Sequence, residues 1–405
     1  MVMKWLRTLL VGPALLAGWV VSTAAAEMET QLEGNIELET RIFTNAMNND
    51  GRDDPNLSGS IDPIFTMLFN RGQHTVTLNP YFRWDLNDDK RTHFDIRQAS
   101  WIGAFGNWEF RFGIDKVFWG VTESAHLVDI INQDDGVEDI DGEDKLGQPL
   151  VSASYWSNYG TVTLVLMPYF RERTFAGVDG RPTSPLRVDT SRPIFSKGNN
   201  NWNPDWAIRY QHAFGMFDVA ASYFKGFSRT PGLVPDLDTQ GAPVLRPSYS
   251  IINQVGVEIQ ATIGAWLFKF EGITNDGRHK DRHYAFASGV EYTFYQAFGT
   301  AADIGVIAEY LHDSRGPNGP SASEDDLFIG LRWEGNDTST TRILAGAIFD
   351  MDSSSKVLFV EASRRIGERW RITLDGRFFV GVPPNDPLFF FRRDDFLQLR
   401  LARFF

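Results

Sequence analysis

Polar and often ionisable side chains alternate with apolar ones in several segments of the chain. In residues 32–42, acidic and basic residues alternate with leucine and isoleucine, and residues 108–115, 369–375 and 396–401 show the same pattern. Because successive side chains of a β-strand point to opposite faces, each segment is expected to form a strand with one apolar and one charged face. Unpaired charges are very costly to bury, so the charged faces predict a wet lumen or a dense ion-pair network.

The charged faces carry both signs in nearly equal numbers. Rings of charge give a pore its ion preference, and a barrel of 16 to 18 strands is wide enough for an aqueous channel. The alternative is that these pairs only brace the wall. We predict pore-lining roles for Glu37, Arg41, Asp95, Arg97, Glu109, Arg111, Asp115, Arg209, Glu258, Glu291, Glu309, Arg332, Arg377 and Arg400.

Acidic residues are concentrated in the segment 120–149. We predict that this segment folds inward, narrows the pore and favours cations, and that Ser124 caps a short helix over 124–132. An exposed loop that binds divalent cations at a lipopolysaccharide surface is the alternative. The predicted constriction residues are Glu123, Asp129, Asp134, Asp135, Glu138, Asp139, Asp141, Glu143 and Asp144.

Signals for catalysis or for a cofactor are weak. The sequence contains no Gly-x-Ser-x-Gly elbow, no phosphate-binding Gly-rich loop and no His-Glu-x-x-His motif. His279 and His283 have metal-ligand spacing, but they flank Lys280-Asp281-Arg282 in a predicted loop. We therefore predict a non-enzymatic protein with no catalytic residue, no metal site and no cofactor. The net charge of −13 also argues against nucleic acid as a partner.

The predicted strands are separated by breaks of two alternating kinds. Short breaks fall at 71–73, 106–107, 158–160, 215–216, 264–265, 335–337 and 367–368, and longer polar breaks at 44–57, 120–149, 172–204, 229–249, 276–282, 314–325 and 381–392. Short periplasmic turns opposite long extracellular loops are typical of transmembrane barrels. The pattern predicts an all-β, antiparallel, up-and-down transmembrane β-barrel of about 18 strands, with 16 as the alternative.

Aromatic residues crowd the short breaks. In a membrane barrel these positions lie at one membrane–water boundary, where amphipathic rings settle. We predict an aromatic girdle there, which includes Phe105, Trp108, Phe214, Phe217, Trp266 and Trp370.

The first residues have the composition of a secretory signal peptide. Lys4 and Arg7 precede an apolar run over 9–21, and Ala24-Ala25-Ala26 provides small residues for cleavage. We predict that residues 1–26 are removed and that residues 27–405 form a single barrel domain.

The last segment, Leu397 to Phe405, resembles the assembly signal of Gram-negative outer-membrane proteins, with alternating apolar residues and a terminal phenylalanine. It departs from that pattern at Arg403. The stretch from Arg111 to Gly120 is also similar to a strand-to-loop stretch of some porin-like families. These resemblances imply a porin-like barrel of the bacterial outer membrane.

The same resemblance sets expectations for function and partners. The leading expectation is a channel for the passive diffusion, either general or solute-selective, of small hydrophilic solutes. The alternative is an exporter or transfer channel for a polysaccharide or lipid. The expected partners are outer-membrane lipid, lipopolysaccharide and, through Phe405, the barrel-assembly machinery. A homotrimer is the oligomer that such barrels suggest.

Overall fold

In the computed structural model, residues 28–44, 55–276, 282–316 and 324–405 are described. Eighteen strands form one barrel: β1 (Glu29–Phe43), β2 (Asn56–Phe69), β3 (His74–Asp85), β4 (His93–Phe105), β5 (Trp108–Asp115), β6 (Gln148–Ser157), β7 (Gly160–Met167), β9 (Asp205–Phe214), β10 (Phe217–Phe227), β13 (Ile251–Ile263), β14 (Trp266–Asp276), β15 (Arg282–Phe294), β16 (Asp303–Asp313), β17 (Asp325–Glu334), β18 (Arg342–Asp350), β19 (Lys356–Ile366), β20 (Trp370–Val380) and β21 (Phe396–Phe404).

The remaining elements lie in the long connections. A separate sheet consists of β8 (Ile194–Phe195), β11 (Gly232–Leu237) and β12 (Pro243–Tyr249), and the 3-10 helices are η1 (Ser196–Gly198), η2 (Ala297–Gly299) and η4 (Pro387–Phe391). No helix among the described residues is long and apolar enough to cross a membrane.

The barrel is closed by its first and last strands. Each barrel strand pairs antiparallel with the next along the chain, and β21 pairs with β1 from Asn35 opposite Phe404 to Phe43 opposite Phe396. Closure leaves no free sheet edge around the cylinder, which a β-structure needs in order to span a bilayer. The predicted fold class and the count of 18 strands are confirmed.

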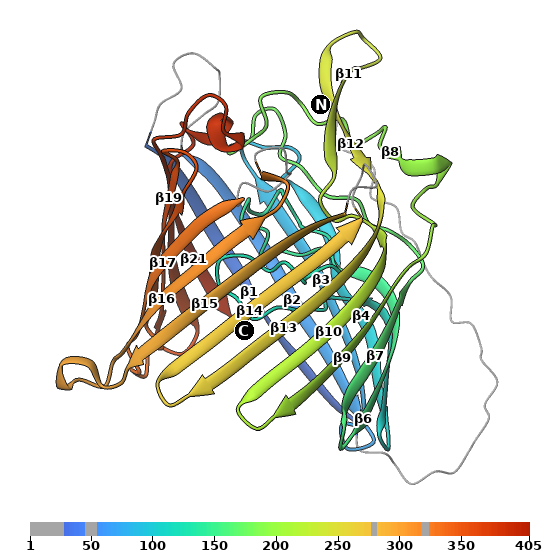
Figure 1. Cartoon of the computed structure of the whole chain (residues 1–405), viewed down its shortest axis with the longest axis vertical. Helices are drawn as coiled ribbons and strands as arrows, with labels where there is room; N and C mark the ends of the chain where they lie inside the picture. Colours follow the sequence, from blue (N-terminus) through green and yellow to red (C-terminus); the bar gives the residue numbers. More distant parts are fainter. Residues whose placement is uncertain (1–27, 45–54, 277–281, 317–323) are drawn as a thin grey trace, which may run out of the picture.

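Short turns and long loops lie at opposite ends of the cylinder (Figure 1), as predicted. Three connections were missed: 86–92 and 351–355 at the long-loop end, and 295–302 at the short-turn end. The last of these contains Tyr295 and Phe298, whose aromatic character makes it look like strand.

The outer wall of the barrel is apolar. On β1, for example, Leu38 is 63% exposed, whereas Glu39 and Arg41, on the other face of the strand, are buried inside. At the short-turn end the predicted girdle is present: Phe105, Trp108, Phe214, Phe217, Trp266 and Trp370 all have exposed rings. The exterior therefore matches the apolar band and aromatic boundary of an outer-membrane barrel.

The C-terminal strand accommodates the unusual arginine at its end. The Arg403 guanidinium lies over the Trp370 ring, 5.8 Å from its centroid, a cation–π arrangement that suits the membrane boundary. The backbone N–H of Phe405 donates to the carbonyl of Gly34 at 3.1 Å, which attaches the chain end to β1. The predicted signal peptide (1–26) and His279 lie outside the described residues.

Ile259 is exposed on the outer wall near the middle of β13, and Gln260 is its inward neighbour. We expect Ile259→Arg to lower the free energy of unfolding by about 2–4 kcal/mol, because it places a cation in the apolar band. Denaturant titration in a thin bilayer measures this loss. Gln260→Arg is the matched control and should cost less than about 1 kcal/mol; equal costs at both positions would contradict the assignment of the two faces.

Candidate functional site

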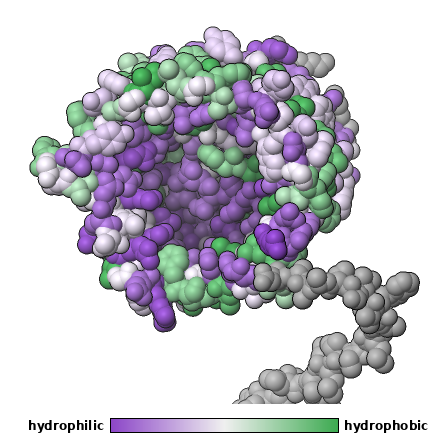
Figure 2. Space-filling view, turned by 90° about the horizontal axis from the view of Figure 1, so that it is seen from below, coloured by the Kyte–Doolittle hydropathy of each residue, from purple (hydrophilic) through white to green (hydrophobic). Residues whose placement is uncertain are grey.

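The barrel interior is hollow at its short-turn end. Seen from that end, the space-filling view shows a hollow lined mainly by hydrophilic residues and surrounded by a more apolar rim (Figure 2). Further in, the connection between β5 and β6, residues 116–147, contacts the inner faces of strands around the barrel. We call this connection the internal loop.

Apolar side chains of the internal loop pack against two apolar patches on the inner wall. Trp119, Val128, Ile130 and Ile131 join one cluster, whose wall residues are Leu150, Val165, Met167, Ala207, Phe224 and Ile252. Ala125 and Leu127 pack against the other, formed by Ala287, Ile307, Leu311 and Phe328. The inner wall is therefore not polar throughout, and the internal loop covers its apolar parts.

Two wall carboxylates hold the internal loop by its backbone. Glu271 of β14 accepts hydrogen bonds from the N–H groups of Val121 and Thr122 at 2.6 and 2.9 Å. Glu309 of β16 accepts from the Ser124 N–H and hydroxyl at 2.8 and 2.6 Å. Both carboxylates are almost fully buried, and hydrogen bonds to a charged group are strong.

The helix predicted over 124–132 is wrong. The structure shows turns and irregular backbone there. The Ser124 hydroxyl that was expected to cap a helix instead donates to the wall carboxylate of Glu309. A side chain distant in sequence thus provides the hydrogen bond that a helix would have provided. A local sequence pattern cannot reveal such a distant partner.

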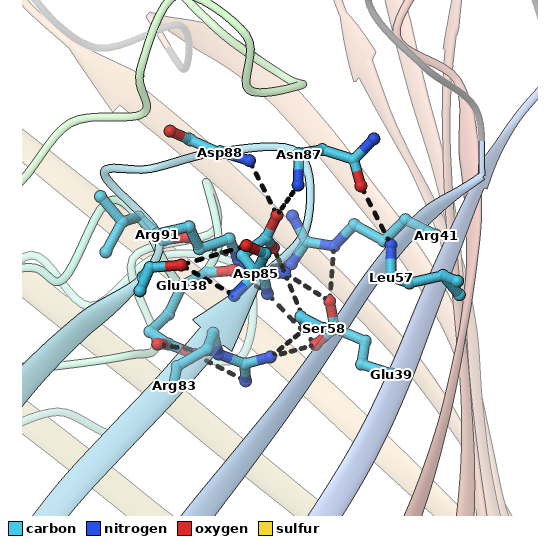
Figure 3. A network of polar contacts seen from close by, with 12 residues as sticks. Glu39, Arg41, Leu57, Ser58, Arg83, Asp85, Asn87, Asp88, Arg91 and Glu138 are labelled. Atoms are coloured by element: carbon cyan, nitrogen blue, oxygen red, sulfur yellow. Dashed lines mark hydrogen bonds and ion pairs between the residues drawn. The ribbon is translucent and has the colours of Figure 1, made fainter. Parts of the chain in front are cut away.

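On the opposite side, arginines of the wall hold the internal loop (Figure 3). The Arg83 guanidinium of β3 pairs with Glu138 at 2.9 Å and with Glu39 at 3.1 Å. Arg41 of β1 donates to the Glu138 carbonyl at 2.6 Å, and Arg91, which follows β3, pairs with Glu39 at 2.7 Å. These five side chains are nearly inaccessible to solvent, so each charge depends on its partners.

A group with metal-ligand geometry lies beside this network. His93, Asp135 and Glu138 each offer one ligand atom within 4.8 Å of the others. The Arg97 guanidinium lies 3.7 Å from Asp135 and 3.8 Å from Glu138, and Arg83 also pairs with Glu138. Two guanidinium groups already balance these carboxylates, and we therefore interpret the group as part of the ion-pair network.

The predicted constriction residues all lie in the internal loop, and the structure pairs most of them with cations. Glu123 pairs with Arg332 at 2.6 Å, Asp129 and Asp134 with Lys145 at 3.3 and 2.7 Å, Asp139 with Arg41 at 3.3 Å, Asp141 with Arg377 at 3.2 Å, Glu143 with His126 at 3.1 Å, and Asp144 with Arg97 at 3.6 Å. The side chains of Glu143 and Asp144 remain 58% and 38% exposed. These two present negative charge to water.

The predicted pore-lining residues separate into two groups. Those buried on the wall are Arg41, Asp95, Arg97, Asp115, Glu258, Glu291 and Glu309. Those with partly exposed side chains are Glu37, Glu109, Arg111, Arg209, Arg332, Arg377 and Arg400. Members of the first group bind the internal loop, another strand or, for Asp95, Arg171 of the β7–β9 connection. In the second group, Arg332 and Arg377 also pair with the internal loop.

Among the acids of the internal loop, Asp129 and Asp144 both have a pKa raised to about 6. Burial raises the pKa of Asp144 to about 6, with the Glu138 carboxylate adding to the rise and Arg97 opposing it. Burial also raises the pKa of Asp129 to about 6, against the attraction of Lys145. Asp144 is the exposed one of the two, so its charge state changes the potential of the lumen near pH 6.

Some residues of the site were missed from the sequence. Arg83 follows the same alternation as the predicted residues, in Tyr81-Phe82-Arg83-Trp84-Asp85, and that alternation would have identified it. Arg91 lies in a connection between strands, where no periodicity marks it.

Glu271 anchors the internal loop, so Glu271→Gln should loosen it. Glutamine keeps one acceptor but loses the charge, which we expect to cost about 1–3 kcal/mol. Amides of residues 121–128 should then exchange with solvent roughly ten- to a hundredfold faster, as measured by hydrogen–deuterium exchange. Glu368→Gln, in an exposed turn, is the control, and unchanged exchange in the Glu271 variant would refute the anchoring role.

No protein-family model matches the chain, and no curated protein matches it in sequence. Solved structures do match. OccD3 (OpdP) of Pseudomonas aeruginosa has 8% identity and a TM-score of 0.54, covering 93% of this chain and 90% of that chain. A BenF-like porin of Pseudomonas fluorescens has 10% identity and a TM-score of 0.54, with coverages of 94% and 98%.

Wzi of Escherichia coli, a carbohydrate-binding β-barrel involved in capsule assembly, has 8% identity and a TM-score of 0.52, with coverages of 91% and 84%. At these identities the likeness concerns the fold. The predicted resemblance and the predicted location in the bacterial outer membrane agree with it: the chain has the fold of the porin-like outer-membrane β-barrels.

Proposed function

We propose that the protein is a channel of the outer membrane for small hydrophilic solutes, narrowed by its internal loop. The observation that carries the proposal is the hydrophilic hollow that enters the barrel from the short-turn end (Figure 2) and meets the internal loop. The exterior is apolar and the interior charged, which is the arrangement of an aqueous pore across a bilayer.

We also infer a preference for cations. Most charges of the internal loop are neutralised by the wall, but Glu143 and Asp144 keep exposed side chains. One exposed charge changes the energy of an ion about 4 Å away by about 1 kcal/mol in water. A fixed negative pair at the narrowed part of the lumen would therefore enrich cations several-fold.

The expected partners follow from this proposal. Outer-membrane lipid and lipopolysaccharide would surround the barrel, Phe405 would present the chain end to the barrel-assembly machinery, and residues 1–26 would be removed during secretion. Neither the homotrimer nor the identity of the solute is needed for the pore itself. We assign no catalytic residue.

The alternative function is export or transfer of a polysaccharide or lipid. It predicts tight binding of one polymer and low ion conductance, whereas the channel predicts stepwise conductance with weak solute binding. Recording purified protein in planar bilayers separates the two directly.

Replacement of residues 124–144 by a glycine–serine linker should raise single-channel conductance about twofold or more, because the open cross-section of the lumen increases. Planar-bilayer recording measures this, and circular dichroism verifies that the barrel is intact. The control is the same replacement of 238–242, the turn of the β11–β12 hairpin, which projects beyond the barrel (Figure 1). Unchanged conductance and ion preference after the first replacement would refute the constriction.

Ion preference should depend on pH through Asp144. Because its pKa is raised to about 6, the carboxyl is protonated below that pH and ionised above it. The preference for cations should therefore rise as the pH increases from about 5 to about 7. The reversal potential in a KCl gradient reports this change. Asp144→Asn should reduce the size of the step, and a step of the same size in the variant would exclude Asp144 as its source.

A further inference from the structure

Two aspartates face each other across β17 and β18 at the long-loop end of the barrel. Asp326 and Asp350 are directly opposite in the antiparallel register, so their Cβ atoms lie about 4.5–5.5 Å apart. Both are on the inward strand faces, two residues from Phe328 and Ile348, which pack inside the barrel. Like charges placed directly opposite in a sheet destabilise it, so the pair is costly without a neutralising partner.

Two further carboxylates lie near this pair. Glu324 and Asp386 are, with Asp350, among the charged groups that act most strongly on Asp326. Ser355 links Asp386 to the pair, because its hydroxyl donates to the Asp386 carboxylate and its carbonyl accepts from the Asp350 N–H at 3.1 Å. We call Glu324, Asp326, Asp350 and Asp386 the acidic cluster.

No cation offsets the acidic cluster within the part of the chain that the structure describes. None of its carboxylates forms an ion pair with a lysine, arginine or histidine there, and the charged groups that act most strongly on Asp326 and on Glu324 are all acids. Arg315, which follows β16, is paired with Asp313. The acidic cluster therefore differs from the His93 group, whose carboxylates are balanced by guanidinium groups.

Asp326 also carries an unsatisfied buried atom. The residue is only 1% exposed, and its Oδ2 atom has no hydrogen-bond partner. By contrast, Asp350 accepts from the N–H and the hydroxyl of Ser353 at 2.8 and 2.5 Å, and Asp386 accepts from the Leu388 N–H at 2.7 Å. A buried carboxylate oxygen without a donor is unfavourable, and a bound cation would satisfy it.

We propose that the acidic cluster binds a divalent cation, and that Ca²⁺ is the ion that suits it. Calcium takes about six to eight oxygen ligands, including carboxylates and waters, in a flexible geometry. Asp326 and Asp350 hold the ion from the wall, Glu324 and Asp386 approach it from the connections, and water completes its shell. The carboxylates are not gathered as tightly as the ligand atoms of the His93 group, as expected while nothing offsets their repulsion.

The bound ion joins parts of the chain that are distant in sequence. Glu324 precedes β17, Asp350 ends β18, and Asp386 caps η4 in the connection before β21. The ion thus clamps long-loop connections to the ends of two strands. No spacing motif links these acids, which is why the sequence did not indicate the site. The clamp is independent of the channel proposal, because binding does not require an open lumen.

Equilibrium dialysis of the full barrel against radioactive Ca²⁺, after removal of metals by a chelator, tests the proposal. We expect wild type to bind one more Ca²⁺ per chain than Asp326→Asn, which keeps the shape of the side chain but removes its charge. Asp89→Asn, at an exposed position in the 86–92 connection at the same end, is the matched control and should bind as wild type does. No binding by wild type, or equal binding by wild type and Asp326→Asn, would overturn the proposal.

A second measurement locates the ion without any substitution. Hydrogen–deuterium exchange of wild type is compared in Ca²⁺ and in chelator. Amides of residues 350–355 and 386–389 should exchange at least threefold more slowly in Ca²⁺, because the ion fixes the carboxylates that these segments carry. Amides of residues 86–92, at the same end but outside the acidic cluster, are the internal control. Unchanged exchange at 350–355, or equal slowing at 86–92, would overturn the proposal.

Discussion

Charges on the inner wall cannot remain buried without partners, and the internal loop supplies many of them. Glu271 and Glu309 lie on one side of the barrel and are satisfied by backbone N–H groups of that loop. Arg41 and Arg83 lie on the other side and are satisfied by Glu138. Removing either partner of a buried pair leaves an uncompensated charge that costs several kcal/mol, so wall and loop depend on each other.

The apolar contacts reinforce the same dependence. Wall residues such as Leu150 and Phe328 point into a cylinder that is otherwise hydrophilic, and they would face water without the internal loop. Apolar burial gives affinity without direction, whereas the hydrogen bonds at Glu271 and the ion pairs at Glu138 fix the position. Together they make the internal loop part of the rigid barrel.

The fold was predictable because its signal is local and repeated. Alternation along β1 or β21, and aromatics beside short turns, follow directly from the two faces of a membrane strand. The partners within the site were not predictable in this way. Glu309 meets Ser124, and Arg332 meets Glu123, across about half of the chain length, and nothing local indicates which strand faces which part of a loop.

The same reasoning explains why Ser124 was assigned to a helix and why the predicted lining residues divide into two groups. Alternation identifies Glu309 and Arg400 alike as inward-facing, but it does not reveal which of them lies beneath the internal loop. Burial beneath that loop changes the role of a charge, because a buried carboxylate holds the structure while an exposed one acts on ions. In the proposed channel, ion preference would therefore depend less on the many charges of the wall than on the few, such as Asp144, whose side chains the paired network leaves in contact with water.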